Sequence, residues 1–108
     1  MKDLATKKCV PCEGGIPPLK GKKLQEYLSQ VSKWNVVEEH HLTKKFKFKD
    51  FKTALKFVNK VGELAEQEGH HPNISFTWGK VEITLFTHAI NGLSENDFIL
   101  ARKIDLLS

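Results

Sequence analysis

Hydrophobic and polar positions follow two different periods along the chain, and each change of period marks a change of element. Residues 20–32 place hydrophobic side chains at i, i+3, i+4 and i+7, which is the spacing of one helix face: Leu24, Tyr27, Leu28 and Val31. Residues 34–36 and 42–48 alternate with a period of two instead. This alternation predicts two strands joined by a turn near residues 38–41. The polar side of the second strand carries Thr43, Lys45, Lys47 and Lys49 and is expected to face water.

A long helix is predicted next. Asp50 can cap its first turn, and Gly69 suits the left-handed position that ends a helix. The expected buried stripe follows helical spacing for four turns and comprises Phe51, Ala54, Leu55, Val58, Val61, Gly62 and Ala65.

The last part of the chain predicts a second hairpin and a last helix. Residues 74–78 and 81–87 alternate between hydrophobic and polar, and residues 79–80 can form the turn between them. Ser94 begins the helix, and Asp97 stands three residues later in the arrangement of a capping box.

The predicted order is therefore helix, strand, strand, helix, strand, strand, helix. Two hairpins separated by a helix favour an α+β two-layer sandwich, with one four-stranded antiparallel sheet and the helices packed on one face. Residues 1–19 lack periodicity and are expected to form an extended leader, whereas residues 20–108 form a single domain. A chain of 108 residues is too short for a (β/α)₈ barrel or a two-half dinucleotide fold.

The net charge of +4 is unevenly distributed. Residues 1–60 contain 14 lysines and 6 acidic residues, whereas residues 61–108 contain 3 basic and 7 acidic residues. Arg102 is the one arginine of the chain, and a lysine excess without arginine is more typical of a solvated surface than of nucleic-acid recognition. Binding of nucleic acid remains an alternative, which predicts a strongly salt-dependent affinity.

Neither a membrane helix nor a secretory signal is visible. No stretch approaches the ~20 apolar residues of a membrane span, and the first residues lead into no apolar segment. A cytoplasmic protein without membrane attachment is expected. Cys9 and Cys12 form one C-x-x-C pair in the leader, which alone cannot complete a four-ligand zinc site. A reduced pair without an essential role is expected, with redox or shared-metal use as the alternative.

Five histidines are an unusual number for this length, because histidine is the side chain that titrates near neutral pH. His40 and His41 fall in a predicted turn and are interpreted as exposed. His70 and His71 precede Pro72 at the junction of a helix and a strand. Adjacent side chains of an extended backbone point in different directions, so these two imidazoles are expected to have separate tasks.

Pairing of the second hairpin about Gly79 would bring Thr87 and His88 to the sheet end that carries His70 and His71. The three imidazoles could then share one pocket, with no metal required. A three-histidine zinc site is the alternative, although vicinal histidines are awkward ligands for one ion.

Three further residues have an ordinary structural explanation beside a functional one. Glu66 lies one turn before His70 and belongs either to the pocket or to the exposed acids of that helix end. Asp97 is explained by helix capping alone. Trp78 could be a core residue on the face of Ile74.

Taken together, these residues resemble the signature of the pterin-4a-carbinolamine dehydratase family. The run Glu66-x3-His70-His71-Pro72-x5-Trp78-x9-His88-x8-Asp97 has the spacing of that family, and the surrounding sequence of residues 46–51, 83–88 and 92–94 agrees with it, whereas Ala89 differs from some relatives. The resemblance covers residues 20–108, and the leader is similar to that of bacterial members.

The resemblance implies an enzyme and a fold. The family dehydrates 4a-hydroxytetrahydropterin to quinonoid dihydropterin, which regenerates the cofactor of aromatic amino-acid hydroxylases. The pterin is the substrate and no cofactor is implied. Members have a four-stranded antiparallel sheet with helices on one face and form homodimers or homotetramers. Vertebrate members also serve as a dimerisation cofactor for a transcription factor, so a non-catalytic binding protein is the alternative.

The resemblance also assigns the site. The catalytic positions fall on His70, His71 and His88, the supporting ones on Glu66, Trp78 and Asp97, and the substrate-binding ones on these histidines with Pro72 and Thr87. Loss of the hydroxyl needs one acid and one base, and imidazole with a pKa near ~6.5 can serve as both. We expect His70 and His88 to share these duties while His71 holds the pterin. Glu66 is expected to bond the pterin or orient His70, and Asp97 to orient His88.

Overall fold

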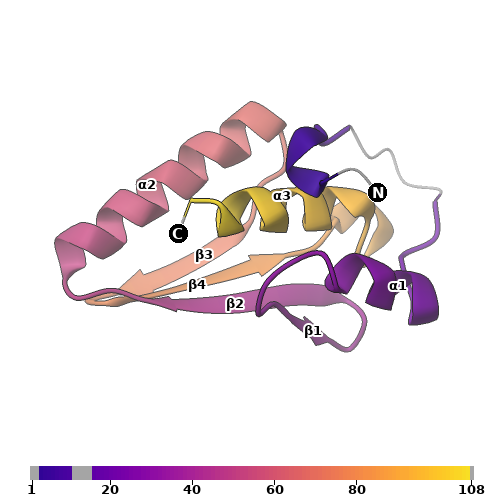
Figure 1. The fold of residues 1–108 in the computed structure, drawn as a ribbon, viewed down its shortest axis with the longest axis horizontal. Coiled ribbons are helices and arrows are strands. Elements are labelled where there is room, and N and C mark those ends of the chain that lie inside the picture. The colour runs from indigo at the N-terminus through magenta and orange to yellow at the C-terminus, as the bar shows by residue number, and fades with distance from the viewer. Residues whose placement is uncertain (1–2, 11–15, 108) are drawn as a thin grey trace.

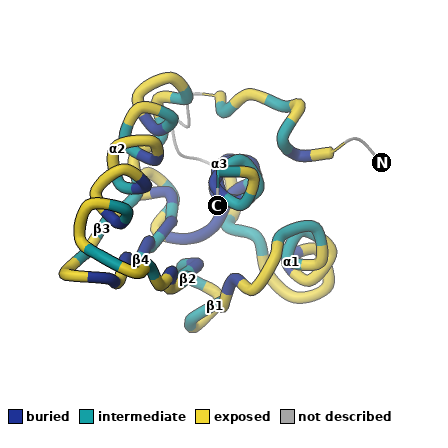
Figure 2. The backbone as a smooth tube through the Cα atoms, turned by 60° about the vertical axis from the view of Figure 1, so that its left-hand side comes forward, coloured by how far each residue is buried: buried dark blue, intermediate teal, exposed yellow. Residues whose placement is uncertain are grey.

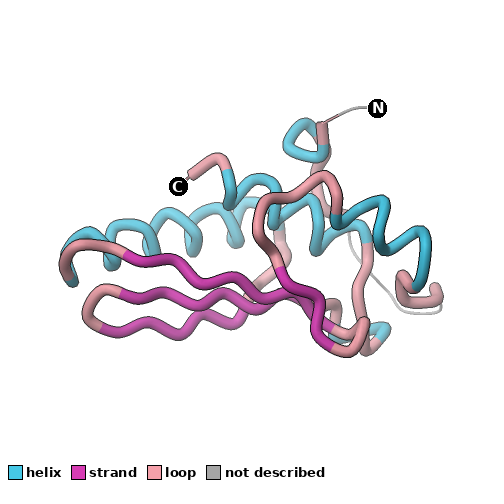
Figure 3. The backbone as a smooth tube through the Cα atoms, turned by 60° about the horizontal axis from the view of Figure 1, so that its bottom comes forward, coloured by secondary structure: helices cyan, strands magenta, loops and turns pink. Residues whose placement is uncertain are grey.

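The computed structural model describes residues 3–10 and 16–107, in which three α-helices cover one face of a four-stranded sheet (Figure 1). The helices and strands, in chain order, are α1 (Gly21–Leu28), β1 (Asn35–Val37), β2 (His41–Lys47), α2 (Phe51–Glu68), β3 (Asn73–Thr77), β4 (Lys80–Leu85) and α3 (Glu95–Asp105). Short 3₁₀ turns, η1 (Leu4–Thr6) and η2 (His88–Ile90), lie before α1 and after β4. The predicted α+β class and element order are confirmed, and Figure 3 shows the helices on one side of the strands.

The sheet has the strand order β1-β2-β4-β3, with every neighbouring pair antiparallel. Each predicted hairpin is present, and β2 pairs with β4 to join the two hairpins at the centre of the sheet. Gly79 is required in the second turn because a Cβ there would lie 2.8 Å from the carbonyl oxygen of Phe48. The two backbones approach this closely because the Phe48 N–H donates to the Gly79 carbonyl at 2.7 Å.

The predicted ends of α2 are confirmed. The Asp50 carboxylate accepts from the Thr53 N–H at 2.8 Å, and Gly69 takes the left-handed conformation with φ 66°. The helix α1 ends at Leu28, earlier than residue 32, and the chain continues in turns that include a bond from the Val31 N–H to the Leu28 carbonyl.

The predicted buried stripe of α2 is partly wrong. The side chains that face the sheet are Ala54, Phe57, Val61 and Ala65. Phe51 and Leu55 are 47% and 39% exposed, and Figure 2 shows the outward side of the helix as exposed. Two apolar ridges run along this helix, and only one of them can face the sheet.

The core lies between the sheet and α3. The inward side chains of β2 and β4 include Leu42, Phe46, Val81, Ile83 and Leu85, and α3 contributes the fully buried Phe98, Leu100 and Ile104. Lys45 and Lys47 are exposed on the open face, as predicted. The place where α3 begins matters for the site, because the first turn of this helix lies next to the end of β4 (Figure 1).

The described leader residues pack on the domain. Leu4 is buried in the one-turn helix η1, and Arg102 of α3 donates two hydrogen bonds to the Asp3 carboxylate. The leader is therefore not extended throughout. Cys12 of the C-x-x-C pair lies outside the described residues.

Among the described residues, none of the helices has the length and apolar character needed to cross a membrane.

Candidate active site

A cavity of about 460 Å³ opens at the sheet end where β3 begins and β4 finishes. Its walls come from the leader, the α2–β3 junction, the β4–η2 segment and α3; the lining residues are Val10, Gly69, His70, His71, Pro72, Asn73, Phe86, Thr87, His88, Ala89 and Asn96. The structure thus brings together the three histidines that the sequence assigns to catalysis, together with Pro72 and Thr87.

The α2–β3 junction gives its two histidines different environments. Gly69 ends the helix in a left-handed conformation, and the His70 N–H still donates to the Ala65 carbonyl at 3.3 Å. The His70 side chain is 13% exposed and that of His71 is 61% exposed. One imidazole therefore enters the protein while its neighbour stays at the mouth of the cavity.

Asp97 binds His70 from beneath the cavity. Its carboxylate is fully buried, and Oδ1 lies 2.6 Å from His70 Nε2. The other oxygen, Oδ2, accepts from the Ser94 N–H and from the Thr87 hydroxyl, each at 2.9 Å. The predicted capping box of α3 is present, so one carboxylate both caps the helix and fixes an imidazole. The expectation that Asp97 orients His88 is wrong, because the buried acid meets the buried histidine and not the exposed one.

Thr87 has a different role from the predicted substrate contact. Its side chain is buried, and its only hydroxyl proton goes to Asp97. The 2.7 Å contact with Ser94 Oγ must then be donated by the serine hydroxyl. Thr87 lines the cavity, and its hydroxyl is committed to holding the carboxylate in place.

Glu66 lies beside the second histidine of the pair. Its Oε2 is 3.3 Å from His71 Nε2, and both side chains are exposed. The expected contact with His70 is absent, because that imidazole points inward to Asp97. A long exposed contact of this kind is weak, and Glu66 is not among the residues that line the cavity.

Trp78 lies far from this cavity. It occupies the turn between β3 and β4, at the opposite end of the hairpin, and is 67% exposed. Neither the predicted support of the site nor the core position is found. Trp78 belongs to the signature by spacing, and the structure separates it from the other residues of that signature.

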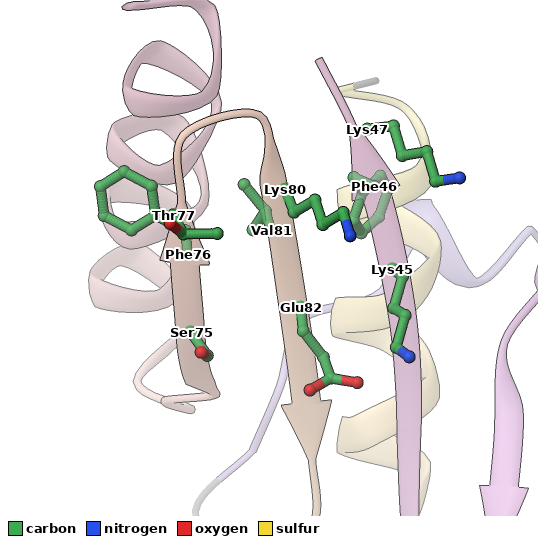
Figure 4. A pocket seen from close by; sticks show the side chains of 9 residues that line it. All are labelled: Lys45, Phe46, Lys47, Ser75, Phe76, Thr77, Lys80, Val81 and Glu82. Carbon is green, nitrogen blue, oxygen red and sulfur yellow. The ribbon is translucent and has the colours of Figure 1, made fainter. Parts of the chain in front are cut away.

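A second hollow of about 420 Å³ lies on the open face of the sheet toward this turn (Figure 4). It is lined by Lys45, Phe46, Lys47, Ser75, Phe76, Thr77, Lys80, Val81 and Glu82. None of these residues is a histidine, so the proton-transfer groups gather in the other cavity.

Sequence reasoning missed two hydrogen bonds that hold the leader against the site. The Asn96 side chain accepts from the Val10 N–H at 3.0 Å and donates to the Val10 carbonyl at 2.6 Å. This reciprocal pair places Val10 in the wall of the cavity. No local pattern marks an asparagine in the first turn of a helix as the partner of a distant backbone.

His40 was also missed. Its imidazole is half-buried, and its ring centroid lies 4.9 Å from that of Phe86, which lines the cavity. The exposed-turn interpretation is therefore wrong for His40, and also for His41, which is half-buried and begins β2. The signal available in the sequence is the pairing of β2 with β4. Phe86 directly follows β4, and His40 directly precedes β2, so this pairing brings the two rings close together.

The described residues contain no group of three or more histidine, cysteine, aspartate or glutamate side chains suited to holding a metal ion.

Cys9 is half-buried beside α3, with its Sγ 3.6 Å from the Asn96 carbonyl. Burial, and then the negative charge of Glu68, raise the pKa of the Cys9 thiol to about 12. The thiolate is the nucleophile, so alkylation by iodoacetamide at pH 8 is expected to be more than ~10²-fold slower in the folded protein than in urea. The measurement uses a Cys12→Ser variant, so that Cys9 alone reports, and equal rates in the two states would contradict the expectation.

Comparison with known proteins agrees with the geometry. The family model described as pterin 4 alpha carbinolamine dehydratase matches residues 17–107. Two curated relatives carry the provisional name pterin-4-alpha-carbinolamine dehydratase. The one from Rubrobacter xylanophilus is 57% identical over 99% of this chain and 100% of its own. The one from Alkaliphilus metalliredigens is 55% identical over 97% and 96%.

Solved structures share the fold. A crystal structure described as a transcriptional coactivator/pterin dehydratase from Brucella melitensis has a TM-score of 0.79 and 35% identity, covering 83% of this chain and 97% of that one. A pterin dehydratase-like protein identified as a RuBisCO assembly factor in the alpha-carboxysome has a TM-score of 0.61 and 28% identity, covering 70% and 89%. The extent of the match in sequence and in structure shows that this chain belongs to the pterin 4 alpha carbinolamine dehydratase family.

Proposed function

We propose that this protein dehydrates 4a-hydroxytetrahydropterins to quinonoid dihydropterins, and so recycles the tetrahydropterin cofactor of aromatic amino-acid hydroxylases. The observation that carries the proposal is the meeting of His70, His71 and His88 in one cavity, with the buried Asp97 bonded to His70. Family membership supports the same reaction. A cavity of about 460 Å³ is also of the size that small ligands occupy.

His70 is suited to be the base. Asp97 Oδ1 accepts the proton on Nε2, which leaves Nδ1 of the neutral ring with a lone pair. When Nδ1 takes up a proton, the buried carboxylate stabilises the imidazolium that forms. In this reaction the ring nitrogen of the substrate loses its proton to His70, and the electron pair of that nitrogen forms the new C=N bond.

His88 is then the acid. It lies at the opposite wall of the cavity in η2 and delivers a proton to the departing 4a hydroxyl as the C–O bond breaks, so that water leaves. The proton lost by the substrate and the proton gained by the hydroxyl balance, and exchange with solvent restores both imidazoles. His71, exposed in the cavity wall, and Glu66, which contacts His71 from outside the lining, hold the polar edge of the pterin.

The test is the rate of quinonoid dihydropterin formation from 4a-hydroxytetrahydropterin, followed by absorbance. We expect the wild-type protein to exceed the spontaneous rate of dehydration. The rate of His88→Ala is expected to be about 10²-fold lower than that of the wild type, at the lower end of what general acid catalysis contributes. Trp78→Ala is the matched control and should keep the wild-type rate, because Trp78 lies at the other end of the hairpin. A wild-type rate equal to the spontaneous one would refute the proposal.

A binding role without catalysis is the second candidate. It is favoured by the two solved relatives described as a transcriptional coactivator and as an assembly factor. The same assay separates the candidates, because a binding protein of this fold would leave the spontaneous rate unchanged and would not respond to changes at His88.

We further propose that the protein acts in the cytoplasm on its pterin substrate, with neither a metal nor a separate cofactor and without binding nucleic acid. Metal analysis of the purified protein distinguishes this from the zinc alternative. A mobility shift at low salt distinguishes it from nucleic-acid binding, which would be strongly salt-dependent.

Self-association into a homodimer or homotetramer is proposed through the outward ridge of α2. Phe51 and Leu55 expose apolar surface there. The exposed charges change sign along the helix, from lysines 52, 56 and 60 near its start to glutamates 63 and 66 near its end. Two antiparallel copies would therefore pair opposite charges. Leu55→Glu is expected to weaken association more than about tenfold in sedimentation experiments, and a monomeric wild-type chain would contradict the proposal.

A further inference from the structure

Three aromatic rings form a row that begins outside the proposed site and ends at its acid. His40 belongs to the turn between β1 and β2, and its ring centroid lies 4.9 Å from that of Phe86. The Phe86 ring in turn lies 4.2 Å from the ring of His88, at an interplanar angle of 46°. The imidazole of His40 therefore contacts the same ring that His88 contacts.

A hydrogen bond joins His40 to the turn that carries His88. His40 Nε2 lies 2.9 Å from Asn91 Oδ1, and Asn91 ends η2 in a left-handed conformation with φ 50°. The Asn91 N–H donates to the His88 carbonyl at 3.1 Å, which closes the turn. His40 thus contacts the 3₁₀ turn of His88 as well as Phe86, the ring that His88 contacts.

The tautomer of His40 follows from its partners. Because Asn91 Oδ1 can only accept, Nε2 of His40 carries the proton. In the neutral ring, Nδ1 then has a lone pair, which accepts from Nδ1–H of His41 at 3.1 Å. His41 begins β2 and is paired with Val37 across the first hairpin, so the row is anchored in the sheet.

His88 depends on this support. Within residues 3–10 and 16–107, its imidazole makes a ring contact with Phe86 and no hydrogen bond to another side chain. His70, in contrast, is fixed by Asp97. The position of the proposed acid is therefore set by the tilted ring contact with Phe86 and by the η2 turn, and His40 contacts both.

We propose that His40 is a positioning residue for His88, holding the acid in place through the Phe86 ring and the Asn91 side chain. The inference rests on the proposed dehydratase function and adds to it a residue outside the cavity. A displacement of about 1 Å at a reacting group can cost ~10²-fold in rate, so loss of this support acts on the chemical step and leaves pterin binding largely intact.

The test measures kcat and KM for His40→Ala, with Lys45→Ala as the matched control on the exposed face of β2. We expect kcat to fall about tenfold with little change in KM, and the control to match the wild type. His40→Phe keeps an aromatic ring beside Phe86 and loses the bond to Asn91, whereas His40→Gln keeps a donor and loses the ring. Each is expected to recover part of the loss. If His40→Ala unfolds, Asn91→Gly carries the test, because glycine accepts the left-handed backbone and removes only the acceptor.

A second measurement separates positioning from general stability. If His40 acts through His88, adding His40→Ala to His88→Ala leaves kcat where His88→Ala alone puts it. An equal loss in both backgrounds would overturn the proposal, as would an unchanged kcat in the single variant.

The imidazole NMR signals of His88 give a readout that does not need activity. We expect them to shift in His40→Ala and not in Lys45→Ala. An inactive wild-type protein with shifted His88 signals would refute the dehydratase proposal and leave the positioning contact standing. Unchanged His88 signals would overturn the inference even in an active enzyme.

Discussion

Replacing Asp97 by asparagine is expected to slow dehydration by ~10²–10⁴-fold while the protein stays folded. Asp97 Oδ1 accepts the Nε2 proton of His70 at 2.6 Å. An amide nitrogen at that place would donate instead, so the His70 proton would move to Nδ1, and the lone pair that we assign to the base would be lost. The amide oxygen could still take the place of Oδ2 and accept from the Ser94 N–H, which preserves the cap of α3.

The measurement is kcat and KM beside a thermal melt. Glu95→Gln is the matched control, because it makes the same chemical change two residues earlier, at a partly exposed acid that bonds Tyr27 and Lys7 instead of a histidine. We expect the control to keep its rate. In a His70→Ala background, Asp97→Asn should cost nothing further, since its effect passes through that imidazole. A rate within twofold of wild type for the single variant would contradict the assignment of His70 as the base.

Local signals in the sequence were sufficient for the elements and for the meeting of the histidines. Asp50 and Gly69 mark the ends of α2 because capping and the left-handed end are decided within one turn of helix. The hairpin register follows from the turn at Gly79 and alternation along each strand, and it places His70 and His88 at one end of the sheet. These features depend on neighbours in the chain.

The partners inside the site depend on packing between distant elements, which the sequence does not encode locally. Asp97 has a complete local explanation as a cap, and its bond to His70 exists because α3 begins at the sheet end beside the α2–β3 junction (Figure 1). His40 looks like an ordinary turn residue until the sheet places Phe86 next to it.

Errors about burial have the same origin. The predicted α2 stripe contains Phe51 and lacks Phe57, because two apolar ridges at helical spacing are equivalent until the sheet selects one. Trp78 continues the alternating pattern of β3, but the strand ends at Thr77. The spacing therefore suggests a place on the core face of the strand, whereas Trp78 lies in the turn and is exposed.

Asp105→Ala is expected to destabilise the fold by about 3–5 kcal/mol, because it leaves a buried lysine without its counter-ion. Lys44 points to the helix side of β2, and its Nζ lies 2.7 Å from Asp105 Oδ1, with side chains only 11% and 5% exposed. The same carboxylate accepts from the Trp34 indole N–H at 2.8 Å and from the Ser32 backbone N–H at 2.9 Å. One side chain thus ties the end of α3 to β2 and to the segment before β1.

The free energy of unfolding in urea measures the effect, and Arg102→Met provides the control on the same helix. Arg102 pairs with Asp3 at the surface, where an ion pair contributes little to stability, so the control should stay close to the wild-type free energy of unfolding. Lys44→Met in the Asp105→Ala background should restore part of the stability, because it removes the unpaired charge while keeping an apolar stem beside Phe46. If the losses of unfolding free energy in the double variant are additive, the Lys44 ammonium reaches water once Asp105 is removed. The inward position of Lys44 would then not depend on Asp105.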